Sequence, residues 1–388
     1  MNSKKITALL LFLCCTVFGQ QKITIDEIYN GTFRAEEMDE LQSMKNTNQY
    51  TVLNLDYQSR SMTIDLYDFA TLKKVTTLID TKSFKELENG IDSYTFDDSE
   101  KQILIACNSN KIFRHSFTAD YYLYNLGNKQ LTKLFEDQVQ EPTFSPDGKK
   151  IAYSKENNLY VYDIASKQTT AITTDGKKNS IINGITDWVY EEEFAFVRAF
   201  DWSKDSKKVA YIRFDETEVP EFSMSIFEKN LYPTIETFKY PKAGEKNSLV
   251  SLHLYDVDSK GTKNVNLGMY NDFYIPRIEW TNDANVLSAK ILNRHQDNLD
   301  LLFVDGTTSL TARWLPACTP GSRSPSRATA GGACNRRPRS TQLLAPVRAS
   351  PRRTAGRLAP GWRCRPVRAE PLLTSGIGPF RSGRSSAV

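Results

Sequence analysis

Residues 144–153 read FSPDGKKIAY: an aromatic residue, a polar turn and the start of an apolar strand. The pattern recurs as WSKDSKKVAY at 202–211, and more loosely as FDDSEKQILI at 96–105 and WTNDANVL at 280–287. Asp beside Gly or Ser favours a tight turn, and Ile or Val favours a strand. Copies at spacings of about 50 residues, followed by alternating strands such as LYVYD at 159–163, are typical of four-stranded propeller blades. The sequence therefore predicts an all-β fold, a β-propeller, with another all-β repeat or a sandwich as the alternative.

The charge distribution divides the chain near residue 311. Residues 1–311 carry a net charge of −10, whereas residues 312–388 carry +14, from 15 Arg, no Lys and one acid. The second segment also holds ten Pro. Such a composition buries too little apolar surface to fold, so we expect a disordered Arg/Pro-rich C-terminal tail over 312–388.

The origin of this tail follows from its residue types. An Arg-rich tail could bind nucleic acid. However, the body uses Lys four times as often as Arg, and the tail uses only Arg. The change from residues with AT-rich codons to residues with GC-rich codons indicates a chimeric or misassembled 3′ end, with a frameshift as the other source. We therefore expect a spurious tail and no nucleic-acid partner.

The N-terminus has the pattern of a secretory signal peptide over residues 1–20. Lys4 and Lys5 precede an apolar run over 6–18, which is too short to span a bilayer. Cys14 and Cys15 would permit a lipoprotein signal, but Leu13 is bulky where that signal needs a small residue. We expect no membrane span and an exported protein, periplasmic or at the cell surface of a bacterium.

Residues 187–194 read DWVYEEEF, three adjacent carboxylates between aromatic residues. Adjacent anions repel, and apolar neighbours would hold them in place. A paired carboxylate held in this way suits a small cation such as the ammonium of a peptide N-terminus. The alternative is a solvated acidic turn. No metal or other cofactor is expected, because His115, His253 and His295 do not form a ligand spacing.

The stretch 187–194 resembles the double-Glu motif of dipeptidyl peptidase IV, in the prolyl oligopeptidase family. FRHSFTA at 113–119, FDETEVP at 214–220 and YPKAG at 240–244 are similar to further segments of that family, in the same order. The resemblance covers roughly residues 25–306. It implies an eight-bladed propeller followed by an α/β-hydrolase domain, in serine exopeptidases that are often homodimeric. These remove X-Pro or X-Ala dipeptides from peptide N-termini.

The same resemblance assigns roles to individual residues. It implies that Glu192 and Glu193 bind the substrate ammonium and that Arg114 contacts a substrate carbonyl. We expect Glu191 to face away into structural contacts, and Trp188 and Tyr190 to pack and orient the helix. Holding the substrate N-terminus at a set distance from a nucleophile would place the cleaved bond after the second residue.

The sequence departs from the family pattern after the propeller. It has no Gly-x-Ser-x-Gly elbow and no His after His295, so no catalytic triad is expected. We expect a partial propeller over 21–311, about five of eight blades, with the hydrolase domain absent and no activity by itself. Two alternatives stay open: a non-catalytic propeller that binds peptides or a partner, and an Arg-rich nucleic-acid binder with a propeller body.

Overall fold

The structure, a computed structural model, describes residues 23–33, 41–56, 59–227 and 229–316. The expected signal peptide, at 1–20, and residues 317–388 of the expected tail lie outside the described residues. The described chain is almost entirely β and divides into two compact units. Unit 1 runs to Val139 without the segment Ile112–Ser116, and unit 2 consists of Ile112–Ser116 and the chain from Gln140 onward.

Unit 1 contains two four-stranded antiparallel sheets whose strands follow chain order. The first sheet consists of β1 (Leu41–Ser43), β2 (Gln49–Asp56), β3 (Ser61–Asp68) and β4 (Lys74–Asp80). The second consists of β5 (Ser93–Phe96), β6 (Gln102–Lys111), β7 (Phe117–Asn125) and β8 (Gln130–Lys133). Two short 3₁₀ turns, Thr81–Ser83 and Lys85–Leu87, follow β4, and the short helix α2 (Ile25–Tyr29) precedes the sheets. Ile64 and Ile79 of the first sheet share one buried cluster with Ile103 and Ile105 of the second.

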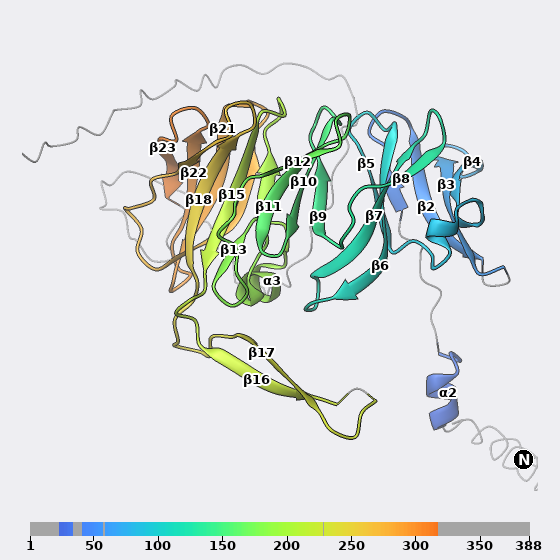
Figure 1. The fold of residues 1–388 in the computed structure, drawn as a ribbon, viewed down its shortest axis with the longest axis horizontal. Helices are drawn as coiled ribbons and strands as arrows, with labels where there is room; N and C mark the ends of the chain where they lie inside the picture. The colour runs from blue at the N-terminus through green and yellow to red at the C-terminus, as the bar shows by residue number, and fades with distance from the viewer. Residues whose placement is uncertain (1–22, 34–40, 57–58, 228, 317–388) are drawn as a thin grey trace, which may run out of the picture. The chain divides into compact units, whose positions relative to one another are not determined.

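Unit 2 contains three larger sheets and a two-stranded hairpin (Figure 1). The first large sheet consists of β9 (Gln140–Phe144), β10 (Lys150–Lys155), β11 (Asn158–Asp163) and β12 (Gln168–Ala171). The next consists of β13 (Ile181–Asn183), β14 (Phe200–Trp202), β15 (Lys208–Asp215), β18 (Leu249–Asp256) and β19 (Gly261–Asn264). The last consists of β20 (Phe273–Trp280), β21 (Val286–Asn293), β22 (Leu299–Asp305) and β23 (Thr311–Pro316). The helix α3 (Trp188–Phe194) lies between β13 and β14 in the chain.

The repeated sequence pattern forms a turn between two antiparallel strands in four of the five blades. The aromatic residue ends one strand, and the next strand starts six residues later, as at Phe144 and Lys150. The Ser145 hydroxyl donates to the Asp147 carboxylate (2.6 Å) and accepts from the Lys150 N–H (2.9 Å). Ser203 makes the matching pair of bonds with Asp205 and Lys208, at 2.6 and 2.8 Å. Side-chain bonds of this kind select the turn over a continuing strand.

A second regularity joins neighbouring sheets of unit 2. The Trp202 indole N–H donates to the carbonyl of Thr143, and the Trp280 indole N–H donates to the carbonyl of Asp201. Each tryptophan therefore bonds to the residue just before the aromatic residue of the preceding sheet. Together with buried clusters that span adjacent sheets, this confirms the incomplete β-propeller. The described residues form five blades.

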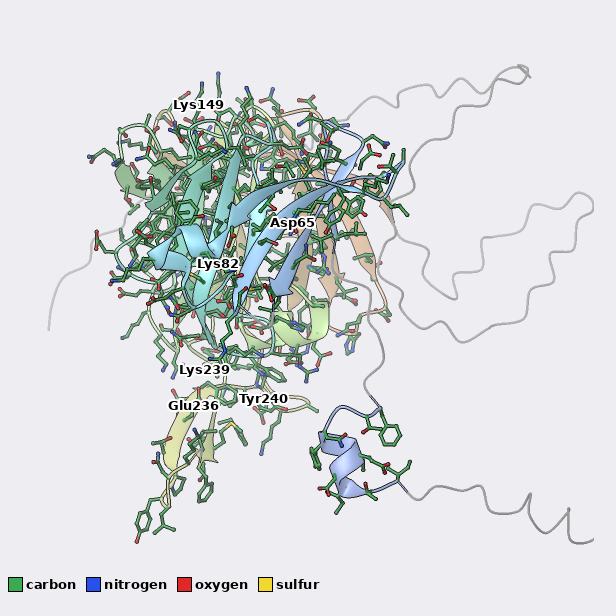
Figure 2. The ribbon with its side chains drawn as sticks, turned by 90° about the vertical axis from the view of Figure 1, so that its right-hand side faces the viewer. Asp65, Lys82, Lys149, Glu236, Lys239 and Tyr240 are labelled. Atoms are coloured by element: carbon green, nitrogen blue, oxygen red, sulfur yellow. The ribbon has the colours of Figure 1, made fainter. Side chains whose placement is uncertain are left out.

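Two features of unit 2 differ from the simple repeat. The hairpin of β16 (Glu221–Ile226) and β17 (Thr234–Lys239) extends away from the sheets (Figure 1). Lys239 and Tyr240 lie at its base, and Glu236 lies further along it (Figure 2). In the last blade, β23 pairs with β22 as far as Pro316. The fifth blade therefore continues beyond residue 311, where the composition changes.

Candidate functional site

The acidic stretch forms helix α3, and Asp187 begins it. One Asp187 carboxylate oxygen accepts from the Tyr190 N–H (3.0 Å), and the other accepts from the Ser248 hydroxyl (2.6 Å). Burial raises the pKa of Asp187, while these bonds act in the opposite direction. An Asp N-cap satisfies a backbone donor that would otherwise be unpaired at the helix start. The bond to Ser248 also ties this end of the helix to the loop before β18.

Tyr190 anchors the helix to the core of unit 2. Its side chain is 1% exposed and its ring contacts four aromatic rings, those of Phe194, Phe196, Phe214 and Tyr274, at centroid distances of 4.8–6.0 Å. The Tyr190 hydroxyl accepts from the backbone N–H of Ile275 (2.9 Å). Burial raises the pKa of Tyr190 well above its ordinary value. The residue packs and orients α3, as expected from the sequence.

Glu191, the first of the three acids, has a structural position. It is 1% exposed, and one of its carboxylate oxygens accepts from the backbone N–H groups of His115 (2.6 Å) and Ser116 (2.9 Å). These two residues belong to the loop between β6 and β7. Glu191 therefore holds this loop against the helix, which agrees with the structural role expected for it.

The loop places Arg114 beside the second acid. Arg114 Nε lies 3.1 Å from Glu192 Oε1, and the Arg114 side chain is 70% exposed while that of Glu192 is 18% exposed. The structure thus brings together two of the three residues singled out from the sequence, 78 positions apart in the chain. The Arg114 guanidinium carries further N–H donors besides that of Nε, and these suit a carbonyl acceptor.

Glu193, the third acid, lies at an exposed position on α3. Within the described chain its carboxylate has no ion pair or hydrogen bond. It borders a hollow of about 300 Å³ that Trp188, Tyr240 and Arg294 also line. The rings of Trp188 and Tyr240 contact each other at 4.4 Å, so Trp188 packs against the segment that follows the hairpin.

Two residues near α3 were not singled out from the sequence. Arg277 donates to the carbonyl of Phe194 (2.7 Å), at the C-terminal end of the helix, and its guanidinium lies over the Phe196 ring at 4.7 Å. A cation there complements the unpaired carbonyls of a helix end. Glu141 has a pKa raised by burial and by the charge of Glu191, against a lowering by Arg198. Arg is rare in residues 1–311, with 7 Arg against 28 Lys. This rarity was the only sequence signal that could have singled out Arg277.

This group of side chains offers carboxylate acceptors for a cation and guanidinium donors for a carbonyl. One carboxylate is partly neutralised by Arg114, and a second is free, so the three side chains carry one net negative charge. Such a site favours an ammonium that can donate charge-assisted hydrogen bonds.

Among the described residues, no helix has the length and apolar composition that a bilayer span requires.

Comparison with known proteins matches the chain to one family model and to several relatives. The family model described as "Dipeptidyl peptidase IV (DPP IV) N-terminal region" matches residues 97–322. The chain is 32% identical over 252 residues to dipeptidyl peptidase 4 of Felis catus, covering 61% of this chain and 32% of that protein. It is 33% identical over 224 residues to a probable dipeptidyl-aminopeptidase B of Talaromyces marneffei, covering 53% of this chain and 25% of that protein.

A solved structure shows the same relationship in three dimensions. The crystal structure of Porphyromonas gingivalis dipeptidyl peptidase 4 matches with a TM-score of 0.71 and 37% sequence identity. The match covers 76% of this chain and 42% of that one. The chain thus spans about a quarter to two fifths of the length of these relatives.

Proposed function

Because this chain belongs to the family of the dipeptidyl peptidase IV N-terminal region, we propose that it is the substrate-gating propeller of an exported serine dipeptidyl peptidase. In this proposal the whole enzyme removes X-Pro or X-Ala dipeptides from peptide N-termini, and this chain recognises the free amino terminus. Residues 1–20 serve as the signal peptide, and the propeller follows, with its fifth blade reaching Pro316.

Three side chains carry the proposed recognition. Glu192 and Glu193 accept hydrogen bonds from the substrate ammonium, and Arg114 donates to a substrate carbonyl. The observation that supports this most directly is the 3.1 Å ion pair between Arg114 and Glu192, on a loop that Glu191 fastens to α3. A site held on both sides by buried contacts needs little reorganisation when a ligand binds.

A binding experiment tests the proposal with the chain itself. Glycyl-proline amide would be titrated into the protein by calorimetry, beside its N-acetyl form, which lacks the ammonium. A charge-assisted hydrogen bond contributes about 1.5–3 kcal/mol, so the free amine should bind roughly tenfold to a hundredfold tighter. The double variant Glu192→Gln/Glu193→Gln should lose that preference.

Glu86→Gln supplies the matched control, because Glu86 is exposed and lies in unit 1. It removes one negative charge without touching α3. Equal affinity of the wild-type chain for both peptide forms would refute ammonium capture, and so would an unchanged preference in the double variant.

A further inference from the structure

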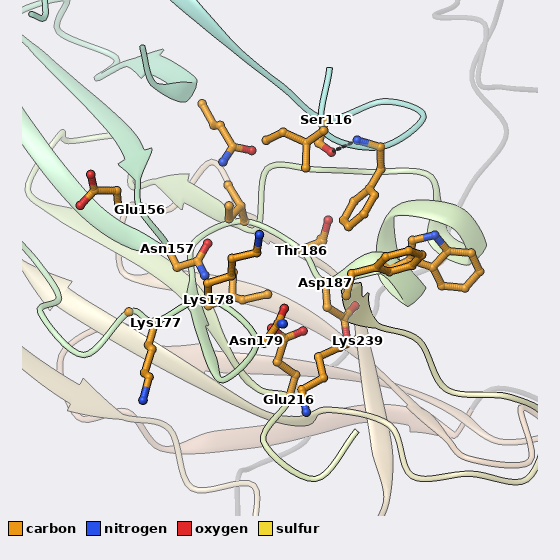
Figure 3. Close-up of a pocket in the computed structure, with 18 of the residues that line it drawn as sticks. Ser116, Glu156, Asn157, Lys177, Lys178, Asn179, Thr186, Asp187, Glu216 and Lys239 are labelled. Carbon is orange, nitrogen blue, oxygen red and sulfur yellow. Dashed lines mark hydrogen bonds between the residues drawn. The ribbon is translucent and has the colours of Figure 1, made fainter. Parts of the chain in front are cut away.

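Unit 2 contains a second cavity, of about 490 Å³, that the peptide site does not use (Figure 3). Its walls come from the loop between β6 and β7, the segment before β13, the start of α3 and strand β17. Apolar surface is supplied by Phe113, Trp188 and Phe238, among others. Neither Arg114, Glu192 nor Glu193 lines it. Cavities of about 300–1,000 Å³ with apolar walls and a few polar groups are typical of small-molecule sites.

Glu216 is the notable polar group of this cavity. The residue is 6% exposed, and within the described chain its carboxyl group has no hydrogen bond and no ion pair. Its backbone is fixed, because its N–H donates to Ser180 (2.8 Å) and its carbonyl accepts from Val219 (3.0 Å). An unpaired buried carboxylate is costly, and a buried charge is ordinarily paired. Without a partner such a carboxyl avoids this cost by holding its proton, whereas a donor or cation in the cavity would stabilise its ionised form.

The nearest cation of the chain does not fill this role. The Lys239 ammonium donates to the carbonyls of Val219 (2.9 Å) and Thr217 (3.3 Å), and it lies 3.6 Å from the Glu221 carboxylate. This ammonium is thus already bonded to two carbonyl groups and paired with a carboxylate. Lys177 and Lys178 also line the cavity, but both are exposed to solvent, which weakens their effect on a bound cation.

We propose that this cavity binds a small organic amine in its protonated form, with Glu216 as the counter-ion and the aromatic side chains around its apolar body. The carboxylate supplies a charge-assisted acceptor for the ammonium. Phe113, Trp188 and Phe238 supply apolar surface and ring faces that attract cations. The cavity shares Trp188 with the hollow beside Glu193, but none of the three proposed peptide-binding side chains lines it.

Titration of Glu216 adds a second readout. Burial, together with the charges of Asp187 and Asp215 and against a lowering by Lys239, raises the pKa of this carboxyl to about 7. The other charged residues that line the cavity are Glu156, Lys177, Lys178 and Glu236. A bound ammonium favours the ionised carboxylate, so binding below pH 7 must release a proton. Affinity should therefore fall as the pH is lowered from 8 to 6.

The probe is benzylammonium chloride, titrated by calorimetry at pH 8, with benzyl alcohol as its uncharged counterpart. The full chain carries Glu192→Gln and Glu193→Gln, so that the peptide site cannot take up the amine. We expect saturable binding of one amine per chain, at least tenfold tighter than the alcohol, and a loss of roughly tenfold or more in Glu216→Gln. Glu279→Gln, an exposed change on β20, should leave the affinity unchanged.

Glu216→Gln removes a buried charge, so the variant is expected to fold, and its thermal melting would be recorded by circular dichroism. At pH 6.5 the binding enthalpy should depend on the ionisation enthalpy of the buffer, which reports the released proton. The proposal is overturned if no saturable binding occurs, if the alcohol binds as tightly as the amine, or if a folded Glu216→Gln variant binds the amine with unchanged affinity.

Discussion

A carboxylate oxygen of Glu191 accepts a 2.6 Å hydrogen bond from the backbone N–H of His115, across 76 positions of sequence. The same oxygen accepts from the next N–H of the loop. Arg114 is next to His115 in the loop, and Glu192 is next to Glu191 on the helix. This contact therefore holds Arg114 beside Glu192. The geometry of the proposed peptide site therefore depends on a residue that is itself buried and unavailable to substrate.

Replacing Glu191 should impair both stability and peptide binding. Glu191→Ala leaves two backbone donors without their acceptor, which costs about 1–3 kcal/mol for each buried group. Urea unfolding would measure this loss, and the affinity for glycyl-proline amide should fall with it because Arg114 is no longer fixed. Glu191→Gln keeps one oxygen acceptor and should restore part of both properties. Peptide affinity that is unchanged in Glu191→Ala would show that the loop is positioned by other contacts.

Tyr190→Phe tests the anchor of α3. The change keeps the ring contacts but removes the hydroxyl that accepts from the Ile275 N–H, so a buried donor loses its partner. We expect the free energy of unfolding to fall by about 1–3 kcal/mol. Tyr232→Phe is the control, because Tyr232 is 80% exposed. Equal stability of the two variants in urea unfolding would contradict the assigned role of the hydroxyl.

Glu216→Gln should change how stability depends on pH. The folded pKa of Glu216, about 7, lies above its ordinary value of 4.5, so between these pH values the folded state holds a proton that the unfolded state has lost. Stability from this group is therefore lost as pH rises through that window. Relative to wild type, the variant should gain up to roughly 3 kcal/mol at pH 8 and almost nothing at pH 4. An equal difference at both pH values would argue against the raised pKa.

His253 should act in the opposite direction. Burial and the charge of Arg213, against a raising by Asp175, lower the pKa of His253 to about 4. As pH falls from 6.5 towards 4, the unfolded chain takes up a proton that the folded chain does not, so stability is lost on the acid side. His253→Phe keeps an aromatic ring stacked on Tyr211 and should remove this loss. Unfolding free energies at pH 7 and pH 4.5 would show it, and the same acid-side loss in the variant would refute it.

The repeated turn predicted most of the fold. Each of its four copies joins two antiparallel strands of one sheet: β5 and β6, β9 and β10, β14 and β15, and β20 and β21. The expected count of about five blades included the first, but the repeat does not mark it, because the turn between β1 and β2 lacks the aromatic and Ser–Asp pattern. The β16–β17 hairpin was also not predicted, since its strands, unlike those of the blades, are mostly exposed and show no regular burial. Its ring contacts, such as Phe113 with Phe238, join segments far apart in sequence.

The site was predictable only in part. The order of acids in the helix, read with the family resemblance, indicated that Glu191 differs from its two neighbours, and its buried contacts agree. The pairing of Arg114 with Glu192 depends on a loop 78 positions away, which no local pattern specifies. Glu216 sits in a segment that the resemblance also included, but the lack of a side-chain partner for it among the described residues follows from tertiary packing alone.

The most direct test of the proposed peptide site is a crystal structure of this chain with glycyl-proline amide bound. We predict that the peptide ammonium lies within about 2.7–3.2 Å of a carboxylate oxygen of both Glu192 and Glu193, with a peptide carbonyl at hydrogen-bond distance from the Arg114 guanidinium. A peptide bound elsewhere on the propeller, or bound with its ammonium directed into solvent, would contradict the account.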